Sequence, residues 1–424
     1  MVPTALIGVV LSEQTISGIT MGSSHVATAG ANKGGAQMRT LITGGTILTP
    51  HTTLAGHTLI AEDGVITALA AGPVASQPGD TVIDASGQWV VPGFIDVHVH
   101  GGVGHDTMDA APEAIASMGR FFAQHGVTSY LPTTMTASAD AIVAAIDNVM
   151  ACQQPADGAR HLGLHLEGPY LNLDYRGAQH PDHFRAPQPD EYARWFATGH
   201  IRLVTAAPEL DGAERFVRAG LVRGVEFAIG HSGASYQQVV EAANWGMRQT
   251  THAFNGMLGL HHREPGTLGG VLSDERIYCQ IIVDGVHVHP AMVKLLVRAK
   301  GPGRTILITD AMRAAGLSDG EYDLGGQAVT VRDGVARIAN GSLAGSTLTL
   351  DVALRNVIAF AGLSLAEALP MATSVPAEAL NLAGHKGTLA VGADADIALL
   401  NPDLTVSATL VAGHVVYRSE RRTA

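Results

Sequence analysis

The sequence predicts an α/β protein: a TIM-like (β/α)8 barrel with a small β-sandwich domain assembled from both ends of the chain. Three observations predict this fold. Short apolar runs alternate with helix-like stretches through the middle of the chain. Segments rich in β-formers, separated by glycine and aspartate, flank that region on both sides. Glycine occupies 50 of 424 positions, which exceeds the usual ~7% and indicates many tight turns.

The middle of the chain contains eight apolar runs that are typical of buried parallel strands. They are Phe94–Val99, Ser129–Leu131, Leu162–Leu166, Leu203–Ala206, Glu226–Ile229, Arg248–Thr251, Gln280–Val283 and Thr305–Ile308. Helices are predicted between them at Glu113–His125, Ala139–Met150, Ala213–Arg218, Tyr236–Ala243, Ala291–Ala299 and Leu350–Ala361. A doubly wound sheet is the alternative fold, but the placement of polar residues at the strand ends favours the barrel.

The two ends of the chain are expected to share one small domain. Residues 38–91 and 386–424 are assigned to the β-sandwich, and residues 92–385 to the barrel. Expected strands are Leu41–Thr49, a hairpin within Thr58–Ile66 that turns at Asp63-Gly64, Val82–Asp84, Trp89–Val91, Ile397–Leu400, Val406–Leu410 and Val415–Tyr417. Residues 1–37 are expected to be a flexible leader or an expression remnant, because no basic residue precedes Lys33 and a signal peptide needs one.

The composition excludes several classes of protein. A net charge of −12 argues against a broadly basic nucleic-acid binder. Two cysteines, Cys152 and Cys279, cannot form a disulfide scaffold or a four-cysteine zinc module. No apolar run reaches the roughly 18 residues of a membrane span. We therefore expect no nucleic-acid partner, no membrane and a cytoplasmic location.

The first candidate metal ligands are His98 and His100, at the end of the first predicted barrel strand. Residues two apart on a strand point to the same side, so both imidazoles can reach one metal ion. The alternative is a pair of polar strand-end residues that bond to buried partners.

Other candidates follow four later strands. Glu167 ends a strand that also contains His165, and an acidic residue there is costly to bury unless it is paired or binds a cation. His231, His252 and Asp310 each follow a further strand. Taken singly, Glu167 could form a salt bridge, either histidine could be a hydrogen-bonded core residue, and Asp310 could cap a helix.

Considered together, four histidines and two carboxylates at five strand ends form a nitrogen and oxygen ligand set. Such a set suits Zn²⁺ or a similar first-row divalent ion. A metal ion lowers the pKa of a water from 15.7 towards ~7, and a neighbouring carboxylate can act as base and then as acid. The residues therefore predict metal-assisted hydrolysis.

These segments also resemble a known family. Val91–His100 resembles the entry motif of the amidohydrolase superfamily. The remaining motifs narrow the resemblance to the N-acetylglucosamine-6-phosphate deacetylases, from about residue 38 to the C-terminus: Leu164–Tyr170, Gly230–Ser232, Thr251–Asn255, Arg263–Gly266, Asp284–His287 and Thr309–Met312. The resemblance implies a metal-dependent, usually homodimeric enzyme that releases acetate from N-acetylglucosamine 6-phosphate in amino-sugar catabolism and cell-wall recycling.

The resemblance also implies a role for each site residue. Glu167, His231 and His252 would bind the principal metal ion, His98 and His100 a second one, and Asp310 would be the acid/base beside it. The metal would be Zn²⁺ or else Fe²⁺, Mn²⁺ or Co²⁺, with one or two ions per subunit. Further implied substrate contacts are His287 to the sugar, Leu343 and Ser346 near the acetyl group, and Asn255, the Gly256 backbone and Arg263 to phosphate, with Arg263 supplied by the other subunit.

One position departs from the family pattern. Gln179 stands where some members have a histidine that polarises the substrate carbonyl, and an amide cannot carry a positive charge. Gln179 could act as a neutral donor, the metal ion could contribute more, or His180 could reach the substrate.

Four alternatives to this function remain open. The nearest is an amidohydrolase for another substrate, above all N-acetylgalactosamine 6-phosphate. A cyclic amidase is disfavoured because no lysine stands beside Glu167, and a serine hydrolase would use Ser232 in Gly230–Ala234. The last is a non-catalytic barrel, which would be expected to have lost its ligands.

Overall fold

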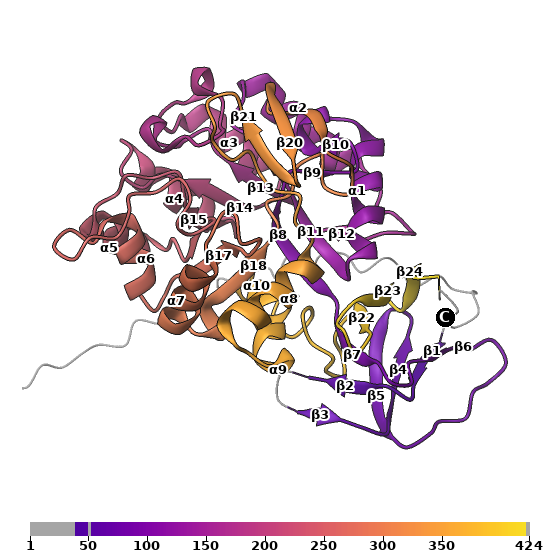
Figure 1. The fold of residues 1–424 in the computed structure, drawn as a ribbon. Helices are drawn as coiled ribbons and strands as arrows, with labels where there is room; N and C mark the ends of the chain where they lie inside the picture. The colour runs from indigo at the N-terminus through magenta and orange to yellow at the C-terminus, as the bar shows by residue number, and fades with distance from the viewer. Residues whose placement is uncertain (1–38, 50–51, 421–424) are drawn as a thin grey trace, which may run out of the picture. The chain divides into compact units, whose positions relative to one another are not determined.

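The computed structural model of the protein describes residues 39–49 and 52–420 (Figure 1). The prediction for residues 1–37 lies outside the described residues.

The eight predicted strands form a nearly closed parallel barrel, which confirms the predicted fold class. Each strand pairs in parallel with the next one along the chain. The strands are β8 (Phe94–Val99), β11 (Val127–Thr134), β13 (Leu164–Glu167), β14 (Ile201–Ala206), β15 (Glu226–Ile229), β16 (Gln249–Thr250), β17 (Tyr278–Ile282) and β18 (Thr305–Ile308). A short strand, β12 (Arg160–His161), pairs with β11 just before β13 does.

Backbone hydrogen bonds bring the first and last barrel strands together. The N–H of Asp310 donates to the carbonyl of His98 over 2.9 Å, and the N–H of His100 donates to the carbonyl of Ala311 over 2.9 Å. These bonds join the end of β8 to the segment that follows β18. The carboxyl ends of all eight strands therefore face one region, where barrel enzymes place their active sites.

Helices connect the barrel strands, and all six predicted helices are present. The α-helices are α1 (Pro112–Gln124), α2 (Ala139–Ala151), α3 (Pro189–Ala197), α4 (Ala213–Leu221), α5 (Tyr236–Trp245), α6 (Gly266–Ser273), α7 (Pro290–Lys300), α8 (Leu350–Ala361), α9 (Leu365–Ala368) and α10 (Ser374–Ala379). The sequence analysis missed α6 because its glycines disfavour a helix. Packing explains those glycines, since a Cβ on Gly270 would lie 2.7 Å from Cβ of Val239 in α5.

The chain ends form two sheets that share an apolar core, which confirms the predicted β-sandwich. One sheet has the order β5-β4-β1-β6 and the other β24-β23-β22-β7-β2-β3. In Figure 1 the yellow strands of the C-terminal end lie beside the indigo strands of the N-terminal end. The strands are β1 (Arg39–Thr43), β2 (Thr46–Leu48), β3 (Thr53–Leu54), β4 (His57–Glu62), β5 (Val65–Ala71), β6 (Thr81–Asp84), β7 (Trp89–Pro92), β22 (Ile397–Leu400), β23 (Val406–Val411) and β24 (His414–Arg418). The exact domain boundaries stay a prediction.

Two predictions about the N-terminal strands had different outcomes. The turn at Asp63-Gly64 is confirmed, since Glu62 pairs with Val65 and both turn residues have positive φ. The single strand Leu41–Thr49 is wrong, because the chain breaks at Gly44, whose φ of +74° is unfavourable in a strand. The two halves, β1 and β2, belong to different sheets.

The sequence analysis also missed a three-stranded antiparallel sheet between β18 and α8. It consists of β19 (Gly320–Leu324), β20 (Gln327–Arg332) and β21 (Val335–Ile338), with β20 and β21 in orange in Figure 1. The signal was present: Asp333-Gly334 separates two alternating segments, as Asp63-Gly64 does at the N-terminal end. The shorter elements are β9 (Gly101–Gly102), β10 (His105–Asp106) and the 3-10 helices Thr107–Asp109, Leu173–Tyr175, Pro181–His183, Pro302–Arg304 and Leu369–Ala372.

Within the described part of the chain, no single helix has the length and apolar character needed to cross a membrane. One bent pair, Leu350–Ala361 with Leu365–Ala379, meets that test by length and composition alone.

Candidate active site

Glu167 lies at the centre of the polar cluster at the barrel's carboxyl end. Its Oε1 is 3.6 Å from Nε2 of His98, 3.2 Å from Nε2 of His231 and 3.0 Å from Nε2 of His252. Its Oε2 is 3.2 Å from Nε2 of His100. The structure thus brings together five residues that lie up to 154 positions apart in the sequence (98 to 252).

Asp310 completes the cluster from the last barrel strand. Its Oδ1 lies 3.3 Å from Nε2 of His98 and 3.1 Å from Nε2 of His100. All six predicted ligands are buried. Their ligand atoms form two groups, His98, His100 and Glu167 on one side and Glu167, His231 and His252 on the other, which share the glutamate.

The hydrogen bonds of two histidines show why this cluster fits a cation. Nδ1 of His100 faces the carbonyl of Thr133 at 3.2 Å, and Nδ1 of His231 faces the carbonyl of Tyr175 at 2.8 Å. A carbonyl only accepts, so each Nδ1 carries a proton and each Nε2 is left to face the cluster. Each Nε2 lies 3.2 Å from an oxygen of Glu167, so a proton or a metal ion has to lie between the nitrogen and the carboxylate oxygen. The residues therefore fit a divalent metal ion, and the shared glutamate is consistent with two.

The pKa values of His100 and Glu167 are shifted by the close contact between histidines and carboxylates in the cluster. Burial lowers the pKa of the His100 imidazole, but its hydrogen bonds with Asp310 and Glu167 outweigh burial and raise the pKa well above the usual value. Burial raises the pKa of the Glu167 carboxyl, but the surrounding histidines, His98 first, outweigh it and lower the pKa well below the usual value. The cluster thus stabilises both its carboxylate charge and the positive charge that a proton or a metal ion supplies.

Three of the six cluster residues have a strained backbone. His231, His252 and Asp310 have φ values of +46°, +26° and +49°, a region that side chains other than glycine seldom adopt. Each residue follows the end of a strand, and its side chain takes part in the cluster: those of His231 and His252 contact Glu167, and that of Asp310 contacts His98 and His100. Such strain persists where the surrounding structure enforces it, most often at functional sites.

An uncharged side chain, Gln179, stands where the sequence analysis expects a histidine in some family members. Nε2 of Gln179 donates to Oε2 of Glu167 over 2.7 Å, and Oε1 of Gln179 accepts from the N–H of Thr136 over 2.8 Å. Gln179 is buried against the cluster. His180 does not line the cavity beside the cluster, and its ring centroid lies 5.0 Å from that of His183.

A cavity of about 260 Å³ opens beside the cluster. Its lining contains five of the eight predicted substrate-binding residues, namely Gln179, Asn255, Gly256, His287 and Leu343. It also contains Ser342 and Gly345, from the segment 342–346 that the family resemblance places near the acetyl group. The sequence analysis did not identify four further lining residues: Met135, Gly177, Ala178 and Leu324. Leu324 belongs to the missed sheet, and the other three lie in loops, where no periodic pattern reveals them.

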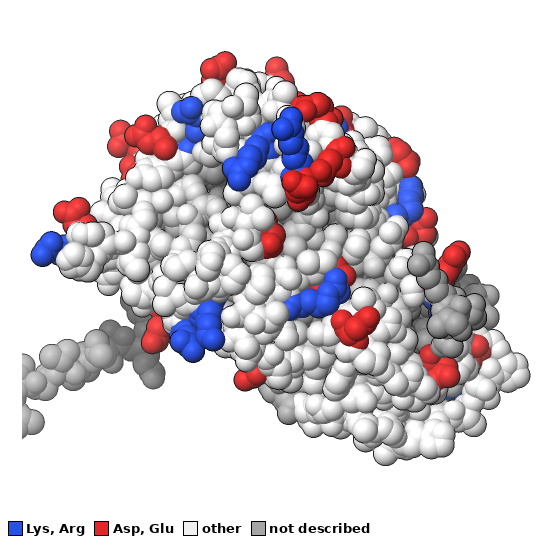
Figure 2. Space-filling view, in the orientation of Figure 1, with Lys and Arg blue, Asp and Glu red and all other residues white. Residues whose placement is uncertain are grey.

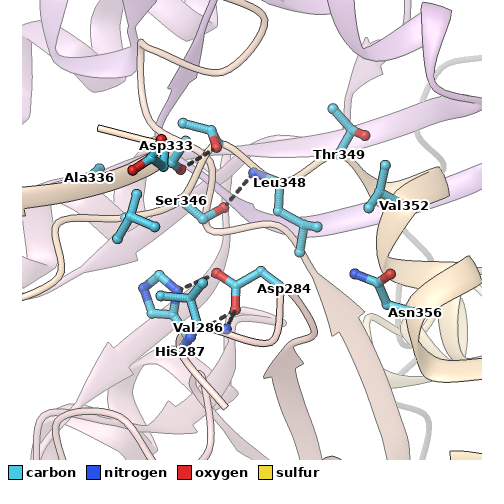
Figure 3. Close-up of a pocket in the computed structure, with 14 residues that line it drawn as sticks. Asp284, Val286, His287, Asp333, Ala336, Ser346, Leu348, Thr349, Val352 and Asn356 are labelled. Atoms are coloured by element: carbon cyan, nitrogen blue, oxygen red, sulfur yellow. Dashed lines mark hydrogen bonds and ion pairs between the residues drawn. The ribbon is translucent and has the colours of Figure 1, made fainter. Parts of the chain in front are cut away.

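His287 lies between this cavity and a second one of about 260 Å³, shown in Figure 3. Nδ1 of His287 is 2.6 Å from Oδ2 of Asp284, and Oδ1 of Asp284 accepts from the N–H groups of Val286 and His287. Ser346 lines the second cavity; its Oγ donates to the carbonyl of Thr309 over 2.6 Å and accepts from the N–H of Leu348 over 3.0 Å.

Arg263 is absent from the lining of the described cavity. It lies in an exposed loop, residues 258–264, that includes the exposed apolar side chains Leu258 and Leu260. Arg263 forms no ion pair with any residue that the structure describes, Glu264 included. Its guanidinium is thus available to a ligand or a second copy of the chain.

A further polar residue, Glu209, holds the turn that carries His231. Its Oε2 accepts from Oγ of Ser232 over 2.7 Å, and its Oε1 accepts from Nδ2 of Asn172 over 2.9 Å and from the N–H of Gly233 over 2.5 Å. Ser232, the alternative nucleophile, therefore uses its hydroxyl in this network. The sequence analysis missed Glu209, although an acidic residue soon after a barrel strand is the signal that identified Glu167.

Comparison with known proteins agrees with this geometry. Residues 89–416 match the model of the amidohydrolase family. The chain is 40% identical over 372 residues to N-acetylgalactosamine-6-phosphate deacetylase from Escherichia coli O157:H7, a match that covers 87% of this chain and 97% of that protein. It is 41% identical over 336 residues to N-acetylglucosamine-6-phosphate deacetylase from Lysinibacillus sphaericus, covering 78% of this chain and 87% of that protein.

Solved structures show the same fold. N-acetylglucosamine-6-phosphate deacetylase from Thermotoga maritima superposes with a TM-score of 0.81 at 32% identity, over 89% of this chain and all of that one. A variant of the Mycobacterium smegmatis N-acetyl-D-glucosamine-6-phosphate deacetylase, solved in complex with N-acetyl-D-glucosamine-6-phosphate, also superposes with a TM-score of 0.81, at 35% identity over 90% of this chain and all of that one. The chain therefore belongs to the amidohydrolase family and, within it, to the group that contains the amino-sugar-6-phosphate deacetylases.

Proposed function

We propose that this protein hydrolyses the acetamide group of N-acetyl-D-glucosamine 6-phosphate, releasing acetate and D-glucosamine 6-phosphate. The convergence of four histidines and two carboxylates in one cluster beside a cavity, in a chain of this family, carries the proposal. We further propose a cytoplasmic location.

The bound cofactor is a divalent metal ion, Zn²⁺ in the first instance and Fe²⁺, Mn²⁺ or Co²⁺ otherwise. Glu167, His231 and His252 would hold one ion, and His98 and His100 the other. When bound, such an ion supplies Lewis acidity, which polarises a carbonyl group and lowers the pKa of a water.

Asp310 moves the proton. Burial raises the pKa of its carboxyl, but His98 and His100 outweigh burial and lower the pKa below its usual value, so Asp310 is ionised at neutral pH. Its Oδ1 can accept the proton of the attacking water, after which the protonated carboxyl donates that proton to the departing amine nitrogen. The amine leaves as the C–N bond breaks, and the acyl carbon keeps the water's oxygen as acetate.

The remaining cavity residues bind and orient the sugar phosphate. We propose that Gln179, His287 and Leu343 contact the sugar and its acetamide, and that Asn255 and the Gly256 backbone bind phosphate. Contacts from His180 and Ser346, which lie outside this lining, stay predictions.

The second phosphate ligand comes from another subunit in this proposal. Arg263 is outside the cavity of its own chain, in an exposed loop with two exposed leucines, as expected of a residue at the interface of a homodimer. Figure 2 shows Lys and Arg side chains scattered among Asp and Glu on the visible face, so the phosphate is not attracted by a broad basic patch there. A single guanidinium, which binds phosphate through two parallel hydrogen bonds, suits such local recognition.

N-acetyl-D-galactosamine 6-phosphate is the alternative substrate. The chain is 40% identical to an N-acetylgalactosamine-6-phosphate deacetylase, over 97% of that protein's length. This relative favours the galactosamine substrate as much as the other relatives favour N-acetyl-D-glucosamine 6-phosphate. The two sugars differ only in the configuration at C4.

The proposal is tested by acetate release from both sugar phosphates and from both unphosphorylated sugars, using the full chain reconstituted with each metal ion. We expect acetate from one phosphorylated epimer with a kcat/KM at least ~100-fold above that of its unphosphorylated form. Asp310→Asn should lower kcat by about 10³ or more, since it removes the proton acceptor, while bound metal stays near normal. Near-native turnover of that variant, or absence of acetate from all four sugars, contradicts the proposal.

A further inference from the structure

One side of the cavity beside the metal-ligand cluster is apolar. Among the residues that line this cavity, the apolar side chains are those of Met135, Ala178, Leu324 and Leu343; the other side chains are polar or are glycine. Met135 and Leu324 are only 2% exposed. We call Met135, Ala178 and Leu324 the apolar wall.

The apolar wall is connected to the cluster through the backbone. Met135 directly precedes Thr136, whose N–H donates to Oε1 of Gln179, and Ala178 directly precedes Gln179. Gln179 in turn donates to Oε2 of Glu167. Two of the three wall residues are therefore adjacent in sequence to residues that hydrogen-bond each other beside Glu167.

The third wall residue comes from the sheet of β19, β20 and β21. Leu324 ends β19, and a Cβ on the following residue, Gly325, would lie 3.4 Å from the Met135 side chain. Nε2 of Gln327, at the start of β20, donates to the carbonyl of Ala178. Met135, Ala178 and Leu324 belong to one buried apolar cluster with the core of this sheet. The wall is thus packed on both sides and cannot move away from a larger ligand without cost.

The chemistry of the substrate indicates what this wall contacts. On the proposed function, the substrate is an N-acylated amino-sugar phosphate, whose hydroxyl groups and phosphate are polar. The alkyl part of the acyl group is its one purely apolar end, and it is bonded to the carbon that reacts at the cluster. We infer that Met135, Ala178 and Leu324 bind this alkyl group and limit the enzyme to acetyl and shorter acyl groups.

The test compares kcat/KM for the N-formyl, N-acetyl, N-propionyl and N-butyryl forms of the preferred amino-sugar phosphate. We expect the wild type to prefer acetyl over propionyl. Leu324→Ala and Met135→Ala should each raise the propionyl-to-acetyl ratio by on the order of 10-fold, since one methylene in an apolar pocket changes kcat/KM by that order or more. Ala178→Val, which enlarges the wall, should lower the acetyl-to-formyl ratio by a similar factor.

Val329→Ala is the matched control. Val329 lies in β20 and belongs to the same buried cluster but does not line the cavity, so this variant loses core packing and should keep the wild-type acyl preference. Melting temperatures of all variants report folding, and Leu324→Val, a smaller truncation, replaces Leu324→Ala if that variant does not fold.

The outcomes separate the two proposals. If the wild type releases no acid from any of the four substrates, the proposed function fails. If it releases acetate but Leu324→Ala (or Leu324→Val), Met135→Ala and Ala178→Val leave the acyl ratios within twofold of wild type, the apolar wall does not set acyl length. An equal change in KM for all four acyl forms would place the wall against the sugar ring and also overturns the inference.

Discussion

Gln179 and Glu167 form a direct hydrogen bond, 2.7 Å from Nε2 of the amide to Oε2 of the carboxylate. The amide's other atom accepts from the backbone of Thr136. Gln179 therefore orients the carboxylate at the centre of the cluster, and it does so without adding charge. Gln179 thus contacts Glu167, a proposed metal ligand, and also lines the cavity proposed to bind the substrate.

Replacing Gln179 should weaken metal binding as well as catalysis. Gln179→Leu keeps the approximate shape but removes both hydrogen bonds, so one oxygen of Glu167 loses a partner. Loss of such a supporting bond typically reduces metal affinity or activity by about 10–100-fold. We expect losses of this size in both kcat/KM and metal affinity, measured by kinetics and by titration with a metal chelator. Gln188→Leu, at an exposed glutamine, is the control. An unchanged metal affinity would show that Gln179 acts on the substrate alone.

Removal of the metal ion should abolish activity and lower stability together. Nε2 of His100 and Nε2 of His231 each lie 3.2 Å from an oxygen of Glu167, so a metal ion between these atoms would hold several segments of the chain together. We expect dialysis against a chelator to eliminate acetate release and to lower the melting temperature, because an ion that binds only the native state stabilises it by mass action. Zn²⁺, Mn²⁺, Co²⁺ or Fe²⁺ should restore both properties, and metal analysis should give one or two ions per chain. Full activity of metal-free protein would contradict the metal assignment.

The origin of the phosphate-binding arginine can be tested by mixing two inactive variants. Arg263→Ala should raise KM for the phosphorylated substrate, and Asp310→Asn should lower kcat. If Arg263 acts across the interface, a mixed dimer contains one site with both residues intact. Equal amounts of the two chains, exchanged freely, should then recover about a quarter of wild-type activity at low substrate concentration. Neither variant alone, taken through the same exchange procedure, should recover activity. No recovery in the mixture would mean that Arg263 serves its own chain or no site at all.

Asp351 should make the stability depend on pH in the acid range. Burial raises the pKa of its carboxyl, but hydrogen bonds from His125 and Thr349 and the charge of Arg355 outweigh burial and lower the pKa below the usual 3.8. A lowered native pKa stabilises the fold above the unfolded value, and that contribution is lost as the pH falls through the native pKa. Asp351→Asn should therefore cost about 1–3 kcal/mol near pH 7, and the difference from wild type should shrink below about pH 4. Urea unfolding at both pH values measures it, with Asp140→Asn, at an exposed helix start, as the control. A pH-independent difference would contradict the ionic contribution of Asp351.

Local patterns of apolar residues in the sequence predicted the strands and helices whose buried side chains recur at regular spacing. The barrel strands Phe94–Val99, Glu226–Ile229 and Thr305–Ile308 and the helix Leu350–Ala361 have the predicted bounds. Each is a continuous apolar run or has helical periodicity with clear ends. By contrast, α6 contains three glycines in eight residues and forms because α5 packs closely against it. The intrinsic propensity of its glycines disfavours a helix, and contacts with the rest of the fold stabilise the helix in spite of this.

The types of ligand and their place at strand ends were determined by the sequence alone. A histidine or carboxylate after a short apolar run belongs at the carboxyl edge of a parallel barrel, because that topology directs every strand end to one side. The sequence could not determine that Glu167 is the shared centre of two histidine groups, since that depends on barrel closure and on the left-handed turns at His231 and His252. Nor could it place Met135 beside Leu324, because these residues meet only when the sheet after β18 packs on the loop after β11. Contacts between distant segments depend on how closely packed surfaces fit, and this information is absent from any local pattern of residues.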